Sequence, residues 1–148
     1  MNVYQSILAV VDLTLDSPAV ARRAQAIATA CGAAAPTLLH VVEYVPAEPL
    51  SDSLLPSVQL ESELLERARV RMAELAARVG NPPLPWRVET GNVKNEVLRA
   101  AREGGHDLIV IGSRERHGLS ILVNFTEDTV LHGAPCDVLA VRIGGNGA

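Results

Sequence analysis

The segment Leu108–Val141 constrains the fold more than any other part of the chain. It opens with the apolar run Leu108–Ile111, continues through Gly112-Ser113 and a polar loop into a helix-like stretch, and closes with a second apolar run. Two buried strands joined through a helix form a parallel βαβ unit, because a parallel pair needs a long crossover. The polar turn then follows the carboxyl end of a strand, where open α/β sheets hold their ligands.

The same alternation of short apolar runs and helical periods continues through the rest of the chain. It predicts five strands, at Ser6–Asp12, Pro36–Val42, Pro85–Thr90, Asp107–Ile111 and Asp137–Ile143. It also predicts four helices, from Asp16-Ser17-Pro18 to Gly32, from about Gln59 to Gly80, from Gly91-Asn92 to Gly104, and over about Leu119–Leu131. We therefore expect residues 1–148 to form a single α/β domain with a doubly wound parallel sheet. This pattern alone leaves flavodoxin-like and Rossmann-like topologies open.

The composition narrows the choice of partners and compartment. The chain has 148 residues and a net charge of −4, which gives no reason to expect nucleic acid or an acidic membrane as a partner. No apolar run approaches the roughly 18 residues of a membrane span. Cys31 and Cys136 lack a metal-type spacing and are interpreted as reduced, buried thiols. We therefore expect a cytoplasmic protein.

Several short motifs occur in a characteristic order and spacing. They are Ala9-Val10-Val11-Asp12, Leu39-His40-Val41-Val42, Gly91, Asp107–Ser113 and Ala134-Pro135-Cys136-Asp137-Val138-Leu139. Through them essentially the whole chain resembles the universal stress protein (UspA) family. The resemblance implies the strand order 3-2-1-4-5, with the switch point between the first and fourth strands and Asp12 beside Gly112. It also implies a homodimer in which the last strands, Asp137–Ile143, meet about a two-fold axis.

The resemblance further implies a nucleotide or anion crevice at this switch point. In the family, Asp12 would face the ribose or a phosphate-bound metal, Val41 and Val42 would flank an adenine, and glycines after the fourth strand would cradle phosphates. The residues at these positions are Asp12, Val41, Val42, Gly112, Ser113, Arg114, Gly118 and Thr126. ATP or AMP would be the ligand, and no catalytic or metal-binding residue is predicted.

The phosphate cradle departs from the family pattern. Glu115 replaces its second glycine, Asn124-Phe125 replaces its final Gly-Ser, and Leu13 stands where many ATP-binding members have glycine. A carboxylate near a triphosphate opposes binding, although nearby basic side chains at Arg114, Arg116 and His117 could neutralise an anion. Alternatively, Gly112 serves only the backbone geometry of a turn, and Asp12 only caps that turn or the following helix.

Three functions follow from these observations. The first is a non-enzymatic stress-response dimer acting through unidentified protein partners, and the second is an ATP- or AMP-binding sensor. The third, a flavin or redox module, is the weakest, because aromatic residues make up only 3% of the chain and a flavodoxin-type phosphate loop is missing after the first strand. No nucleophile elbow or acid–base pair indicates an enzyme.

Four further expectations concern individual segments. The alternating strand Pro85–Thr90 is expected at a sheet edge. The Pro-rich stretch Glu43–Val58 is expected to be a loop that either covers the crevice as a flap or packs its leucines onto the second helix. His40 is expected to be a satisfied core or site-lining histidine. The cluster Arg67, Arg69 and Arg71 is interpreted as a solvated helix face.

Overall fold

The computed structural model describes residues 3–43, 54–114, 130 and 132–143, with the side chains of 54–59 and 114 outside this description. Its sheet has five strands in the order β3-β2-β1-β4-β5, and every neighbouring pair is parallel. The strands are β1 Ile7–Val10, β2 Thr37–Val42, β3 Trp86–Thr90, β4 Leu108–Arg114 and β5 Asp137–Ile143. The strand order expected from the family resemblance is confirmed.

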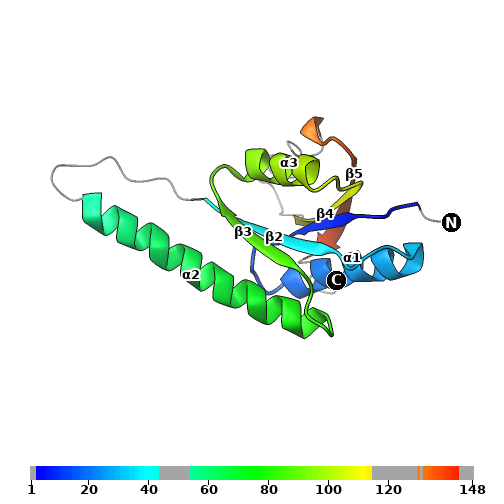
Figure 1. The fold of residues 1–148 in the computed structure, drawn as a ribbon, viewed down its shortest axis with the longest axis horizontal. Helices are drawn as coiled ribbons and strands as arrows, with labels where there is room; N and C mark the ends of the chain where they lie inside the picture. The colour runs from blue at the N-terminus through cyan, green and yellow to red at the C-terminus, as the bar shows by residue number, and fades with distance from the viewer. Residues whose placement is uncertain (1–2, 44–53, 115–129, 131, 144–148) are drawn as a thin grey trace.

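In the described part of the chain, three long helices cover the two faces of this sheet (Figure 1). They are α1 Ser17–Cys31, α2 Leu54–Val79 and α3 Val93–Glu103. The chain steps from β1 to β2 to β3 in one direction, so right-handed crossovers put α1 and α2 on the same face. The step from β3 back to β4 places α3 on the opposite face.

The strands divide the apolar interior into two cores. Ile7, Ala9, Leu38 and Val110 face α1 and α2, where they pack with Met72 of α2; this is the α1/α2-side core. The strand residues that alternate with them face α3, where they pack with residues of that helix and with Val130. This α3-side core comprises Leu8, Val10, Leu39, Val41, Val97, Leu98, Ala100, Ala101, Ile109, Ile111 and Val130. A central strand buried on both faces must be apolar at every position, which explains the continuous apolar runs.

Local sequence signals set the helix ends. Gly32 ends α1 in the left-handed region, with a φ of 68° that favours glycine. Asn92 begins α3, and its side-chain oxygen accepts a hydrogen bond from the backbone N–H of Asn95 at 3.0 Å. Both predicted helix boundaries are confirmed.

Three predicted boundaries are wrong. Strand β1 ends at Val10 and not at Asp12. Strand β4 does not stop at Ile111 but continues through Arg114, because Gly112, Ser113 and Arg114 pair with the last three residues of β5. Helix α2 begins at Leu54 rather than near Gln59, so the end of the expected loop Glu43–Val58 is helical. Pro56 is tolerated there because the first turn of a helix has no partner for its N–H groups. Residues 44–53 lie outside the described part of the chain.

The last predicted helix falls largely outside the described residues. Val130 is helical and fully buried in the α3-side core, and His132 and Gly133 are also helical. Among the helices that the structure describes, none combines the length and apolarity needed to cross a membrane.

The two edges of the sheet differ in chemistry. Strand β3 is an edge, as predicted, and it carries the ion pair Arg87–Glu89 at 2.8 Å, with Arg99 of α3 also reaching Glu89 at 3.7 Å. The other edge, β5, presents Leu139 and Ala140 to solvent. One edge is therefore charged and the other is largely apolar.

The helix cap at Asn92 can be tested by mutation. Asn92→Ala should lower the free energy of unfolding by about 1 kcal/mol, because the Asn95 N–H loses its acceptor. Asn92→Ser keeps an acceptor oxygen and should lose much less. Urea denaturation followed by circular dichroism measures both, and equal losses in the two variants would contradict the capping role.

Candidate functional site

The carboxyl ends of β1 and β4 lie side by side. Val10 of β1 stands opposite Ile111 of β4, so the residues that follow, Asp12 and Gly112-Ser113, continue from adjacent positions. On its other side, Val10 stands opposite Leu39 of β2. This junction, where the connections leave for opposite faces, is the expected switch point.

Asp12 closes the turn between β1 and α1. Its Oδ1 accepts hydrogen bonds from the backbone N–H of Thr14 at 3.1 Å, the Thr14 hydroxyl at 2.7 Å and the Ser17 hydroxyl at 3.1 Å. Ser17 is the first residue of α1 and is buried. The carboxylate therefore holds the turn and the start of the helix, which is the structural alternative considered for this residue. Whether Asp12 also contacts a ligand stays a prediction.

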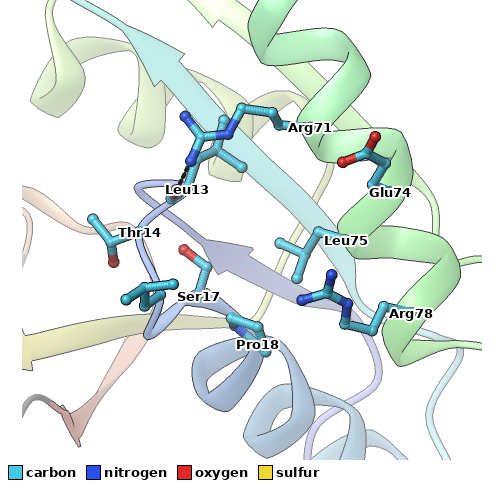
Figure 2. Close-up of a pocket in the computed structure, with 9 residues that line it drawn as sticks. Leu13, Thr14, Ser17, Pro18, Arg71, Glu74, Leu75 and Arg78 are labelled. Atoms are coloured by element: carbon cyan, nitrogen blue, oxygen red, sulfur yellow. Dashed lines mark hydrogen bonds between the residues drawn. The ribbon is translucent and has the colours of Figure 1, made fainter.

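Leu13 occupies a backbone conformation normally reserved for glycine. Its φ is 61°, while its side chain is buried in the α1/α2-side core. Its carbonyl oxygen accepts a hydrogen bond from the Arg71 guanidinium of α2, drawn as a dashed line in Figure 2. The turn thus has a shape that glycine adopts without strain, although a leucine occupies it.

Arg71 is a residue whose role the sequence analysis missed. Arg67, Arg69 and Arg71 are all exposed, as the interpretation of a solvated face expects, but Arg71 also ties α2 to the β1–α1 turn. The two partners are 58 residues apart in the chain, so no local pattern signals the contact.

Gly112 is closely packed, and it has no special turn geometry. It lies within β4, opposite Val141, and is not among the described glycines with positive φ. A methyl carbon at this position would lie 2.6 Å from Cδ1 of Ile143 and 3.2 Å from Cγ2 of Val20. The expectation of a Gly-Ser turn is therefore corrected: Gly112 lets α1 and β5 approach the strand.

The structure describes some of the remaining predicted crevice residues and not others. Val41 and Val42 are buried in the α3-side and α1/α2-side cores respectively, and packing explains both. Ser113 is half-buried at the end of β4. The side chain of Arg114, together with Gly118 and Thr126, lies outside the described residues.

His40 of β2 braces the end of β1. Its Nδ1 lies 2.8 Å from the carbonyl oxygen of Val11, and because a carbonyl can only accept, Nδ1 must be the donor. The ring is half-buried. This contact confirms the interpretation of His40 as a satisfied histidine.

Several shifted pKa values lie at the opposite, amino-terminal ends of the strands. Burial lowers the pKa of His106 and raises that of Cys136. Burial alone would raise the pKa of Asp107, but hydrogen bonds from the backbone N–H groups of Gln5 and Ser6 outweigh it and leave the pKa lowered. The hydrogen bond to Asp137 raises the pKa of Tyr4. These shifts accompany contacts that tie the ends of β1, β4 and β5 together.

The described residues contain no group of three or more His, Cys, Asp or Glu side chains that could hold a metal ion. What the switch point does offer is the carboxylate of Asp12, with the hydroxyls of Thr14 and Ser17 bonded to it.

Comparison with known proteins identifies the family. Residues 3–142 match the universal stress protein family. Universal stress protein A homolog 2 of Coxiella burnetii is 40% identical over 109 residues, which cover 74% of this chain and 75% of that protein. The chain therefore belongs to the universal stress protein family.

Solved structures share the fold. The universal stress protein UspA from Lactobacillus plantarum superposes with a TM-score of 0.69 at 26% identity, covering 94% of this chain and 98% of that chain. A universal stress protein solved in complex with cAMP superposes with a TM-score of 0.58 at 24% identity, covering 94% and 97%.

The packing role of Gly112 predicts a specific compensation. Gly112→Ala should lower the free energy of unfolding by about 1–3 kcal/mol, because the new methyl group overlaps Cδ1 of Ile143. In an Ile143→Val background, which lacks that carbon, the same substitution should cost clearly less. Guanidinium denaturation of the four proteins of this cycle measures the difference, and an identical cost in both backgrounds would exclude the proposed contact.

The left-handed conformation of Leu13 predicts that glycine is a more stable replacement than alanine there, the reverse of the usual order. Leu13→Ala and Leu13→Gly both lose the buried side chain, but the glycine variant should be the more stable by about 1 kcal/mol because it has no Cβ strain at a φ of 61°. At the buried β2 residue Leu39, the alanine variant should be the more stable one. Thermal unfolding of the four variants tests this, and the same order at both sites would refute it.

Proposed function

We propose that this universal stress protein is a non-enzymatic, cytoplasmic stress-response protein that acts as a homodimer through protein contacts and has a degenerate nucleotide crevice. The observation that carries the proposal is the replacement of cradle glycines by Glu115 and Asn124-Phe125. These positions lie outside the residues that the structure describes. The cytoplasmic assignment is supported by the free thiols of Cys31 and Cys136.

The electrostatic cost of Glu115 is large enough to matter. A carboxylate about 4–6 Å from a phosphate costs about 1 kcal/mol in water and several times that in a partly closed crevice. The engagement of Asp12 Oδ1 by Thr14 and Ser17 adds to this, because that oxygen is already used within the turn. Together these terms could move a micromolar nucleotide site into the millimolar range.

The second candidate is a sensor that binds ATP or AMP. It is supported by the retention of Asp12 and Gly112 at the switch point and by a protein of this fold that was solved with cAMP. Arg114, Arg116 and His117 supply positive charge that would offset Glu115.

Calorimetric titration with Mg-ATP separates the two candidates. The nucleotide-free protein should bind Mg-ATP weakly or not at all, because repulsion from Glu115 and the loss of close backbone N–H contacts oppose it. The variant Glu115→Gly, Asn124→Gly, Phe125→Ser restores the cradle and should create or strengthen binding. A low-micromolar dissociation constant for the unchanged protein would favour the sensor.

The dimer is supported by the contrast between the sheet edges. An unpaired strand edge exposes N–H and C=O groups that invite another strand, and charged side chains discourage this. The charged pair Arg87–Glu89 protects β3, whereas β5 exposes Leu139, at 36%, next to Ala140. The β5 edge is accordingly the one suited to pair with a second copy about a two-fold axis.

A charge introduced on β5 should dissociate this dimer. We expect the unchanged protein to sediment as a dimer at micromolar concentration, and Leu139→Lys to sediment as a monomer with an unchanged circular dichroism spectrum. Val70→Lys is the matched control, because Val70 is 50% exposed but lies on α2. A monomeric unchanged protein, or a dimeric Leu139→Lys variant, would contradict the proposed interface.

A further inference from the structure

An open pocket of about 450 Å³ lies between the β1–α1 turn and the middle of α2. Figure 2 shows the turn on one side and side chains of α2 on the other. Ligand pockets in proteins measure about 300–1,000 Å³, so this one has room for a small organic molecule. Neither Asp12, Val42 nor Gly112 lines it, so it is separate from the family crevice.

Two arginines of α2 give the pocket its charge. Arg71 and Arg78 are two helical turns apart, about 10 Å along the axis, and therefore share one face. Figure 2 shows both guanidinium groups extending toward the β1–α1 turn. With the acidic Glu74 included, the charged side chains of the lining sum to +1.

The two arginines differ in the hydrogen bonds that they make. Arg71 donates a hydrogen bond to the carbonyl oxygen of Leu13. Arg78 has no hydrogen bond or ion pair to any other residue that the structure describes, Glu74 included. A guanidinium offers five N–H donors in a planar fork that matches carboxylate and phosphate oxygens. Arg78 is therefore the side chain available to an incoming anion.

The other lining residues indicate which chemical groups the rest of a ligand would carry. Leu75 is buried at the floor, and Pro18 and the 99%-exposed Leu15 form the apolar rim. The hydroxyls of Thr14 and Ser17 already donate to Asp12, so toward the pocket their oxygens can only accept. These hydroxyls cannot donate a hydrogen bond to an anion, so anion binding falls to the arginines of α2.

The backbone N–H groups at the amino end of α1 are not available to bind an anion either. The N–H groups of Ala19 and Val20 bond to the carbonyl oxygen of Asp16, and Pro18 has no N–H to offer. Anion recognition in the pocket thus depends on Arg78, two helical turns from the anchored Arg71.

We propose that this pocket binds a small amphipathic anion, a carboxylate or phosphate monoester on a compact apolar body. The anionic group lies on Arg78, and the apolar body lies against Leu75, Leu15 and Pro18. The site is distinct from the nucleotide crevice proposed at the switch point, because its anion-binding residue Arg78 and its apolar residues lie outside that crevice, and Thr14 and Ser17 connect the two through Asp12.

Titration of the ¹⁵N-labelled full chain tests this, with phenyl phosphate and benzoate as probes and benzyl alcohol as their uncharged analogue. At least one anion should shift the amide resonances of Leu15, Ser17 and Leu75, and the two anions distinguish a phosphate from a carboxylate ligand. Arg78→Gln should weaken binding about tenfold or more, since a charged hydrogen-bond donor is lost. Arg69→Gln, the matched control, removes the same charge from α2 outside the lining and should leave affinity unchanged.

Four results would overturn the proposal. They are the absence of shifts with both anions at millimolar concentration, equal losses in Arg78→Gln and Arg69→Gln, binding of benzyl alcohol as tight as that of the anions, and shifts confined to the crevice around Asp12 and Gly112. None of these results depends on whether Mg-ATP binds.

Discussion

The pairing of β1 with β2 on one side and β4 on the other is the constraint on which the rest of the structure depends. All four residues of β1 are buried, so both faces of the sheet centre must be covered by helices. That requirement places α1 and α2 on one face and α3 on the other. The same pairing brings the ends of β1 and β4 together, and it thereby creates the switch point, where Asp12 and Gly112 follow paired residues of neighbouring strands.

The turn after β1 holds a leucine in a backbone conformation that favours glycine. A non-glycine residue in the left-handed region costs about 1–2 kcal/mol, whereas burying a leucine side chain contributes about 1.5–3 kcal/mol. Burial therefore offsets the strain at Leu13, and the contact from Arg71 adds to it. One face of this turn belongs to the switch point, where Asp12 lies, and the other borders the pocket that contains Arg78. The turn thus separates two candidate binding regions in one small domain.

The two sheet edges differ in a way that bears on how the protein assembles. Strand β3 carries Arg87 and Glu89 and is linked to α3 through Arg99, whereas β5 carries small and apolar side chains between the charged residues Asp137 and Arg142. A protein that has to pair one edge and protect the other would distribute its charges in this way. The proposed dimer and the proposed lack of enzymatic activity agree with each other, since both assign the function to surfaces rather than to a reactive centre.

The sequence by itself determined the five strands, their class of sheet, the family, the caps at Gly32 and Asn92, and the edge position of β3. These features depend on periodicity, on local cap chemistry or on motif order, all of which can be read along the chain. Only the tertiary structure decided why position 112 is glycine, how far β4 extends, and what Arg71 does. Each of these depends on a partner distant in sequence, namely Ile143 and Val20 for Gly112, β5 for the end of β4, and Leu13 for Arg71. Such contacts exist only once the strands and helices have packed, so no local pattern could specify them.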